Sequence, residues 1–170
     1  MSKIYIIGIV ASGKTTLAKK LSRELSIPYY ELDCIIHHKT NTERYKRTPK
    51  EQVEVINDID SNGDWIIEGT YRESCHCLFN MADKIIFLDT PLWKRRYRIL
   101  LRYIKQQLLI EKCHYKSNLK MLKKMYKWTR EFENNRAKFE KMLHQYSNKL
   151  ITVKNVKEIF VDSIFSLFTT

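Results

Sequence analysis

Glycine, proline and long apolar runs are scarce in this chain of 170 residues, and each scarcity excludes a class of protein. Four Gly and three Pro are too few for a loop-rich all-β fold with many tight turns. No apolar run approaches the roughly 20 residues that cross a bilayer. The apolar run that ends at Gly8 is too short for a signal peptide, and no small-residue cleavage site follows it. The sequence therefore predicts a single cytosolic domain, residues 1–170, with no membrane contact.

Cysteine is also scarce, and its spacing gives no disulfide framework. The four residues are Cys34, Cys75, Cys77 and Cys113. Cys75-His76-Cys77, with His37-His38 as further ligands, leaves a metal site open as an alternative. Structural zinc sites usually pair their ligands as Cys-x₂₋₄-Cys, a spacing that is missing here. Reduced thiols are therefore the favoured interpretation.

Acidic residues are scarce in only one part of the chain. The net charge is +12, and 44% of the residues are apolar, which is a globular composition. Residues 1–90 carry 12 Lys and Arg against 13 Asp and Glu, whereas residues 91–141 carry 16 against four. Because the whole positive excess lies in one segment, that segment must meet an anionic partner or be heavily solvated.

Five short apolar segments predict strands, and helical patterns separate most of them. The expected strands are residues 4–7, 28–33, 65–68, 84–89 and 150–153. Leu17, Leu21 and Leu25 follow the first strand with helical spacing, and a capping box at Thr48-Pro49-Lys50-Glu51 predicts the start of another helix. We expect residues 34–47 to be irregular and residues 156–168 to form a last helix. Strands that alternate with helices predict an α/β fold with a parallel sheet.

Residues 91–149 interrupt this alternation with nearly sixty residues that carry no strand signal. Two long helices fit the segment, at about residues 92–110 and 117–146. The sequence therefore predicts a basic helical insertion within the domain. Trp93, Trp128 and the interleaved tyrosines could stack on nucleobases, but aromatic residues at helical spacing more often pack in a core or between helices.

The segment Gly8-Ile9-Val10-Ala11-Ser12-Gly13-Lys14-Thr15 matches the phosphate-binding pattern G-x-x-x-x-G-K-[ST]. Its glycines let the backbone N–H groups point at a phosphate, and the helix that follows adds its positive end. Lys14 supplies a cation, and the Thr15 hydroxyl can ligate Mg²⁺. A glycine turn without function would not explain Lys14 and Thr15. We expect ATP to be bound by Gly8, Ala11, Ser12, Gly13, Lys14, Thr15 and Thr16.

With this loop and the segments 29–33, 65–69 and 87–91, the whole chain resembles the small P-loop kinases of the adenylate kinase and shikimate kinase type. Within that group it is most similar to the bacterial DNA topology modulation proteins. The resemblance implies a P-loop NTPase fold, with a five-stranded parallel sheet in the order 2-3-1-4-5, helices on both faces and a helical lid at residues 91–149.

The resemblance also implies an acceptor site. Asp33 would contact the phosphoryl acceptor and take its proton, although a helix cap or a solvated loop position is an alternative. Adenylate kinases carry Asp-Gly-Phe-Pro-Arg where this chain has Glu68-Gly69-Thr70-Tyr71-Arg72. We therefore expect Glu68 to serve Mg²⁺ through water and Arg72 to bind an anionic group of the acceptor. The loss of Phe-Pro weakens the case for AMP as the acceptor. For Asp89, a helix cap before Pro91 is the favoured interpretation.

In similar kinases the helix after the fourth strand carries lid arginines that neutralise the phosphoryl group in transfer. Arg98 and Arg102 fit that role by resemblance, and their spacing places them on one face of a helix. Arg130 and Arg136 could approach from the second long helix. Arg95, Arg96 and Arg136 fit a solvated basic face at least as well. By resemblance, Asn155 would lie near the adenine.

The sequence thus predicts a kinase that uses ATP and Mg²⁺ to phosphorylate a small acceptor, a nucleotide or another metabolite. The alternative is a nucleic-acid-associated ATPase of the DNA topology modulation type. The basic segment favours weak nucleic-acid contact, but the chain shows no helix-turn-helix, zinc-finger or RNA-binding signature. A nucleotide-binding module without catalysis is disfavoured because Asp33, Glu68 and the arginines occur together.

Overall fold

A computed structural model describes residues 2–40, 44–108 and 118–155 of the chain. The expected last helix at residues 156–168, together with Cys113 and Lys116, lies outside these ranges.

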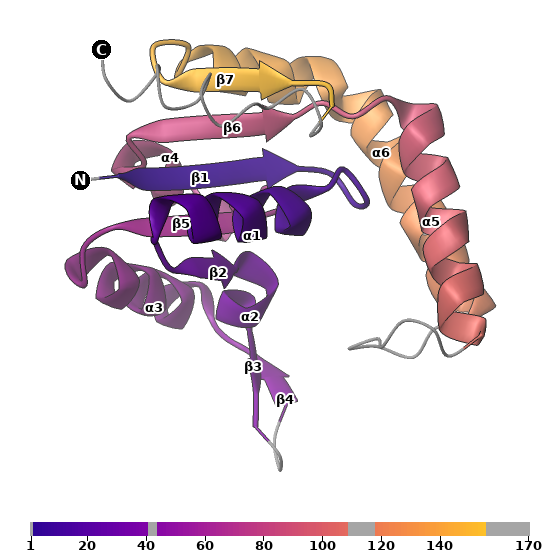
Figure 1. Cartoon of the computed structure of the whole chain (residues 1–170), viewed down its shortest axis with the longest axis horizontal. Coiled ribbons are helices and arrows are strands. Elements are labelled where there is room, and N and C mark those ends of the chain that lie inside the picture. Colours follow the sequence, from indigo (N-terminus) through magenta and orange to yellow (C-terminus); the bar gives the residue numbers. More distant parts are fainter. Residues whose placement is uncertain (1, 41–43, 109–117, 156–170) are drawn as a thin grey trace.

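Five parallel strands form the central sheet, as predicted (Figure 1). They are β1 (Lys3–Gly8), β2 (Tyr29–Glu31), β5 (Trp65–Gly69), β6 (Lys84–Leu88) and β7 (Leu150–Val153). Their order is β2-β5-β1-β6-β7, which confirms the order 2-3-1-4-5. The three central strands are almost continuously apolar, as is typical of parallel strands that are covered on both faces.

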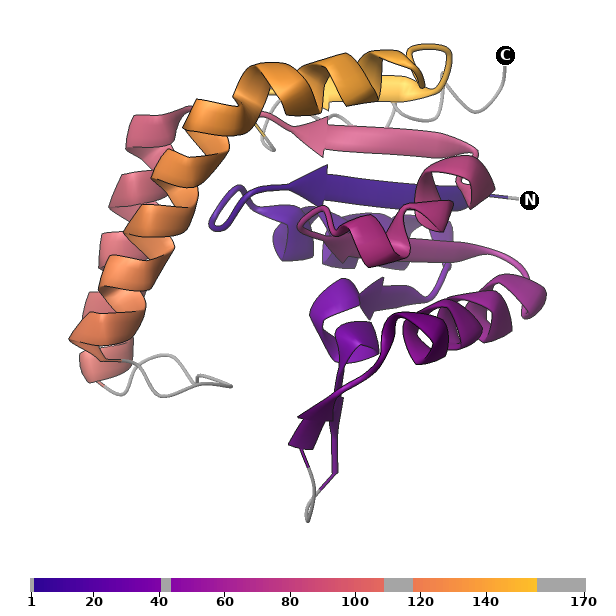
Figure 2. The same ribbon diagram turned by 180° about the vertical axis from the view of Figure 1, so that it is seen from behind.

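Alternate residues of the strands pack into two cores. Ile4 and Ile6 face α1 (Lys14–Leu25), which contributes Leu17 and Leu21. Tyr5 and Ile7 face the other core, where α3 (Pro49–Ser61), the 3₁₀ helix η1 (Glu73–Cys75) and α4 (Cys77–Met81) pack. Figure 2 shows this second face of the sheet. The alternation follows from the two-residue period of a strand. In open parallel sheets, ligands bind at the carboxyl ends of the strands.

The segment after β2 differs from its prediction. The strand ends at Glu31, and residues Leu32–Ile36 form a short helix, α2. His37–Lys39 (β3) and Arg44–Lys46 (β4) then pair as an antiparallel hairpin where an irregular segment was expected. Burial accounts for the helix, because Leu32, Ile35 and Ile36 insert into the core with a spacing that only a helix allows.

Two long helices, α5 (Leu92–Gln107) and α6 (Leu119–His144), confirm the predicted helical segment. They lie side by side and extend away from the sheet, and we call this pair the helical arm (Figures 1 and 2). The last turns of α6 return to the sheet, where Phe139 and Leu143 join the core. At about 1.5 Å per residue, the 26 residues of α6 span about 39 Å.

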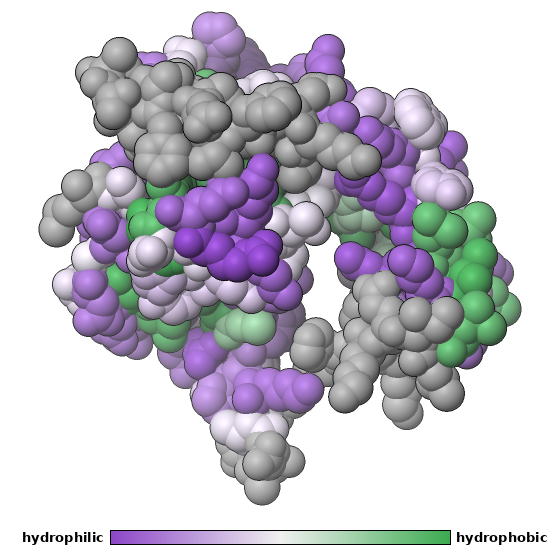
Figure 3. All heavy atoms as spheres, in the orientation of Figure 1, coloured by the Kyte–Doolittle hydropathy of each residue, from purple (hydrophilic) through white to green (hydrophobic). Residues whose placement is uncertain are grey.

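Two aromatic residues on the outer face of α5 correct the expectation that the aromatic residues of this segment are packed, whereas Tyr103 lies against α6. Trp93 is 69% exposed and Tyr97 is 57% exposed. Leu100, Ile104 and Leu108 are also exposed, and together they form an apolar patch along the outer side of the helix (Figure 3).

Across the described ranges, we find no helix with the length and hydropathy needed to span a membrane.

Candidate active site

The phosphate loop joins β1 to α1 and is tightly wound. The Ser12 N–H donates to the Ile9 carbonyl at 3.2 Å, and Ala11 and Gly13 have φ values of 60° and 104°. Gly13 tolerates that left-handed conformation because it has no side chain. A Cβ on Gly8 would lie 2.7 Å from Ser12 Oγ. The loop therefore needs a glycine at both of these positions.

Two side chains of the loop offer polar groups to a ligand. Ser12 is fully buried, and its hydroxyl has no hydrogen-bond partner among the described residues. The Lys14 ammonium donates to the Ile9 carbonyl at 3.0 Å. Burial lowers the pKa of Lys14, while the nearby carboxylates of Glu68 and Asp33 oppose that shift. An unpaired buried hydroxyl is costly, and a phosphate oxygen would satisfy it.

Thr15 and Glu68 meet at the carboxyl edge of the sheet. The Thr15 hydroxyl, in the first turn of α1, donates to Glu68 Oε1 at 2.5 Å. Glu68 stands near the end of β5, beside β1, and is only 5% exposed. Burial raises its pKa above the usual range, and Lys14 partly offsets the shift. A hydroxyl and a carboxylate beside a phosphate loop are the hard oxygen ligands that Mg²⁺ prefers, so these residues fit the predicted metal site.

Asp33 and Arg72 form an ion pair near the carboxyl ends of β2 and β5. Arg72 Nη2 lies 3.1 Å from Asp33 Oδ1. Asp33 lies in the first turn of α2 rather than at the end of a strand, and α2 starts directly after β2. Its side chain is largely exposed, whereas the Nε group of Arg72 is buried and has no partner among the described residues. The two predicted acceptor residues are therefore neighbours, and the Nε group of Arg72 could still donate a hydrogen bond to a ligand.

A close backbone approach holds these two elements together. A Cβ on Gly69 would lie 2.4 Å from Leu32 Cβ. Leu32 is buried and directly precedes Asp33, while Gly69 directly follows Glu68. The glycine therefore sets the distance between the acceptor side of the site and the carboxylate on β5.

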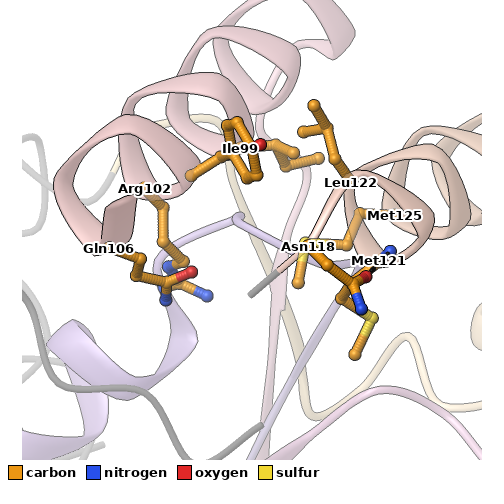
Figure 4. A pocket seen from close by; sticks show the side chains of 8 residues that line it. Ile99, Arg102, Gln106, Asn118, Met121, Leu122 and Met125 are labelled. Atoms are coloured by element: carbon orange, nitrogen blue, oxygen red, sulfur yellow. Dashed lines mark hydrogen bonds between the residues drawn. The ribbon is translucent and has the colours of Figure 1, made fainter. Parts of the chain in front are cut away.

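The helical arm contacts the phosphate loop through α5. Arg98 Nη1 donates to the carbonyls of Ala11 at 3.2 Å and Ser12 at 2.9 Å. The charge of Arg102, one turn further along α5, contributes to lowering the pKa of Lys14. Figure 4 shows Arg102 and Gln106 on the side of α5 that lines a hollow next to α6. The structure thus places Arg98 on the loop, and the role predicted for Arg102 stays a prediction.

The other charged residues of the arm are placed differently from their predictions. Asp89 does not cap α5, whose N-cap is Pro91; its Oδ2 instead accepts from Arg136 Nη2 at 2.7 Å. Arg136 also lies 2.7 Å from Glu140, so carboxylates on two sides hold its partly exposed guanidinium. Arg95 is 1% exposed, because its position faces into the arm. Its ion pair with Glu133 gave no signal in the sequence.

The remaining predicted residues lie at the periphery. Thr16 is exposed in the first turn of α1, and Asn155 is partly buried two residues after β7. Arg96 and Arg130 are exposed on the arm. The roles predicted for Thr16, Asn155 and Arg130 in binding stay predictions.

The Cys75-His76-Cys77 segment packs within the protein. Cys34, Cys75 and Cys77 are free thiols. His76 Nε2 lies 3.1 Å from the Tyr146 hydroxyl, and its ring contacts Phe79. Within the described ranges, no group of three or more His, Cys, Asp and Glu side chains is placed to hold a metal ion.

Comparisons with known proteins point to small kinases. No protein-family model matches the sequence. A shikimate kinase from Aquifex aeolicus is 25% identical over 183 aligned positions, which cover 97% of this chain and 95% of the relative. A shikimate kinase from Bacteroides fragilis is 49% identical over 43 residues, and that match spans about a quarter of either chain.

Solved structures share the fold at low sequence identity. Shikimate kinase from Acinetobacter baumannii superposes with a TM-score of 0.62 at 16% identity, covering 99% of this chain and 93% of that one. A gluconokinase from Sinorhizobium meliloti gives a TM-score of 0.55 at 15% identity over 93% and 86% of the two chains. This chain has the fold of the small P-loop kinases. The closer resemblance to DNA topology modulation proteins stays a prediction.

Proposed function

We propose that this chain is an ATP-dependent kinase that transfers the γ-phosphoryl group to a hydroxyl of a small molecule. One observation carries the proposal: a phosphate loop, a hydroxyl–carboxylate pair and an Asp–Arg pair meet at one edge of the sheet. Sequence similarity to shikimate kinases over nearly the whole chain supports the same reaction class.

The phosphate loop would hold the triphosphate. Its backbone N–H groups and the start of α1 favour anions. The Ser12 hydroxyl would gain its missing partner, and Lys14 would exchange the Ile9 carbonyl for phosphate oxygens. Because burial has lowered the pKa of Lys14, an anionic ligand would also favour its charged form.

Thr15 and Glu68 would hold Mg²⁺, Thr15 directly and Glu68 through water. When bound, the ion supplies positive charge to the phosphate oxygens. The hydrogen bond between the two residues orients the hydroxyl before any ligand arrives. Glu68 must be ionised for this role, and its buried position makes the carboxylate strongly attractive to a cation.

Asp33 and Arg72 would bind the acceptor. Arg72 offers its spare N–H groups to a carboxylate or phosphate of the substrate, and this partly releases Asp33. Asp33 then accepts the proton of the attacking hydroxyl. Arg98 and Arg102 complete the site from α5 by neutralising charge on the phosphoryl group in transfer.

The first test combines nucleotide binding with an acceptor panel. ATP and Mg²⁺ at a hundredfold excess over Kd should stabilise the fold by about 2.7 kcal/mol. Shikimate, gluconate and a set of nucleosides are then incubated with ATP, and both ADP and phosphorylated acceptor are measured. An unchanged melting temperature with ATP would contradict the phosphate-loop assignment.

The Asp33→Asn variant should keep ATP affinity and lose most turnover, because it removes a proton acceptor and leaves the phosphate loop intact. Lys14→Ala should lose ATP affinity. Glu54→Gln, an exposed carboxylate on α3, is the matched control. If Asp33→Asn weakened ATP binding as much as Lys14→Ala does, Asp33 would belong to the metal site.

A nucleic-acid-associated ATPase is the second candidate. The observation that favours it is a set of exposed lysines along the arm, on α6: Lys120, Lys123, Lys124 and Lys127. Such a surface attracts polyanions without reading sequence. ADP formation that needs DNA and no small acceptor would support this candidate over the first.

A further inference from the structure

Arg95 is a buried arginine inside the helical arm, and it joins three parts of the chain. It is 1% exposed. Its Nε group donates to the Thr90 carbonyl at 2.8 Å, and Nη2 forms an ion pair with Glu133 of α6. The guanidinium also lies over the Phe132 ring, 5.7 Å from its centroid. Arg95 therefore connects α5 to α6 through Glu133, and to the segment between β6 and α5 through Thr90.

Thr90 extends this connection to the phosphate loop. Thr90 is 2% exposed, and its hydroxyl donates to the Ser12 carbonyl at 2.9 Å. Arg98 donates to the same carbonyl at 2.9 Å. A continuous path of hydrogen bonds thus runs from Glu133 on α6, through Arg95 and Thr90, to Ser12 in the loop.

Stability is a poor explanation for this arrangement. Burying an ion pair costs desolvation energy that its attraction often fails to return, and apolar replacements are often neutral or stabilising. The Nη1 group of Arg95 is buried without a hydrogen-bond partner among the described residues, which adds to the cost. Directed, charge-assisted hydrogen bonds do fix one relative orientation of the elements they join.

The orientation of α5 matters because the helix acts as a lever. Arg98 and Arg102 lie three and seven residues after Arg95 on the same helix. At about 1.5 Å per residue, Arg102 lies about 10 Å along the axis, so a tilt of about 10° at Arg95 would move it by roughly 2 Å. A misplacement of about 1 Å can cost a hundredfold in rate.

We propose that Arg95 is a positioning residue, which holds α5 at the angle that places Arg98 and Arg102 over the phosphate loop. This inference rests on the proposed kinase function. Arg95 itself does not touch the substrate; it acts through α5. Its contacts with Glu133 and with the Thr90 carbonyl set the orientation of α5.

The decisive variant replaces the ion pair by apolar side chains of similar size, Arg95→Met with Glu133→Leu. The melting temperature should stay the same or rise, and ATP Kd should change less than threefold because Lys14 and Thr15 are untouched. The value of kcat should fall at least tenfold. Exposed neighbours of the same charge provide the matched control, Arg96→Met with Glu131→Gln, which should leave all three quantities unchanged.

Two single variants sharpen the test. Arg95→Lys should not restore kcat, because one ammonium group cannot reach Glu133 and the Thr90 carbonyl in the same geometry. Glu133→Gln weakens only the contact between Arg95 and α6, and it should lower kcat less than the double variant does. If the double variant fails to fold, Glu133→Gln decides the question, and normal kcat in that variant overturns the proposal.

Hydrogen exchange of the α5 amides gives a readout that does not depend on turnover. The double variant should exchange faster over the first two turns of α5, while amides of the central sheet stay protected. Retained kcat in a folded double variant, or a parallel loss of kcat and melting temperature, would overturn the positioning role. If the wild type transfers no phosphoryl group at all, the proposed function fails, and unchanged exchange would then reject the positioning role separately.

Discussion

At the residue scale, a tightly wound backbone and a buried charge place different demands on side chains. The loop from Gly8 to Thr15 needs two glycines for its winding, and Ser12, Lys14 and Thr15 present polar groups where the sequence predicts them. Arg95 was not predictable, because a buried arginine in a basic helix has the same local sequence as a solvated one. Only its partner Glu133, 38 residues away in the chain, distinguishes the two environments.

The burial of Glu68 gives a prediction for pH dependence. Burial raises its pKa, so the protonated form accumulates at a higher pH than for an ordinary carboxyl group. Protonated Glu68 cannot hold a cation, and affinity for Mg·ATP should therefore fall as the pH is lowered through this raised pKa. Calorimetric titration of ATP with Mg²⁺ between pH 8 and pH 5 checks the trend.

The comparison variant for this measurement is Glu68→Gln. It should bind Mg·ATP weakly at every pH and lose the part of the pH dependence that Glu68 contributes. The nucleotide's own phosphate, with a pKa of about 6, titrates equally in both proteins and cancels in the comparison. Parallel pH profiles for the wild type and the variant would contradict a role for Glu68 at the metal.

At the element scale, local chemistry predicted the start of α3 but not the end of β2. The Thr48 side chain accepts from the Glu51 N–H, and Glu51 accepts from the Thr48 N–H, so the predicted capping box is confirmed. The prediction of a second strand over residues 28–33 is too long, since β2 ends at Glu31. Tertiary packing decides that boundary, since Leu32, Ile35 and Ile36 fill the core as a helix.

The arm helix α5 carries a prediction of its own. Arg98→Met and Arg102→Met should each lower kcat by about 10²–10³, the loss typical of a removed charge-stabilising donor, or about 3–4 kcal/mol. Arg98→Met should also weaken ATP binding, because Arg98 donates to the carbonyls of Ala11 and Ser12 in the phosphate loop. Steady-state kinetics with the identified acceptor, together with ATP Kd values, measure both effects.

Arg96→Met is the control for these two variants, since it removes the same charge from an exposed position of the same helix. Its kcat should match that of the wild type. An equal loss in all three variants would mean that the net charge of the arm, and not the placement of Arg98 and Arg102, sets the rate.

At the scale of the whole molecule, charge and catalysis are unevenly distributed. Residues 1–90 contain the phosphate loop and the residues proposed to bind the metal and the acceptor, and they carry almost no net charge. The positive excess of residues 91–141 includes Arg98, which contacts the phosphate loop, and lysines that are exposed along α6. The sequence could predict the excess, but the division depends on how α5 and α6 pack.

That division predicts that polyanion binding and phosphoryl transfer are separable. Four exposed lysines of α6, at positions 120, 123, 124 and 127, are replaced together by Gln. Binding of a labelled 20-base-pair DNA duplex is measured between 50 and 200 mM NaCl. The variant should bind more weakly and with a smaller salt dependence, because each lysine that neutralises a phosphate contributes about 0.9 to the slope of log K against log salt.

Turnover of the small acceptor should be unchanged in this variant, since none of these lysines contacts the phosphate loop. A control with the same change in charge replaces Lys19, Lys39, Lys46 and Lys50, which are exposed on other elements and should affect DNA binding less. Lys127 Nζ lies 3.6 Å from Glu131 Oε1, which partly neutralises its charge. Lys127 should therefore contribute least to DNA binding. If the α6 variant lost turnover while Arg98→Met and Arg102→Met kept it, the arm would serve a polyanion, and the nucleic-acid-associated ATPase would become the better account of this protein.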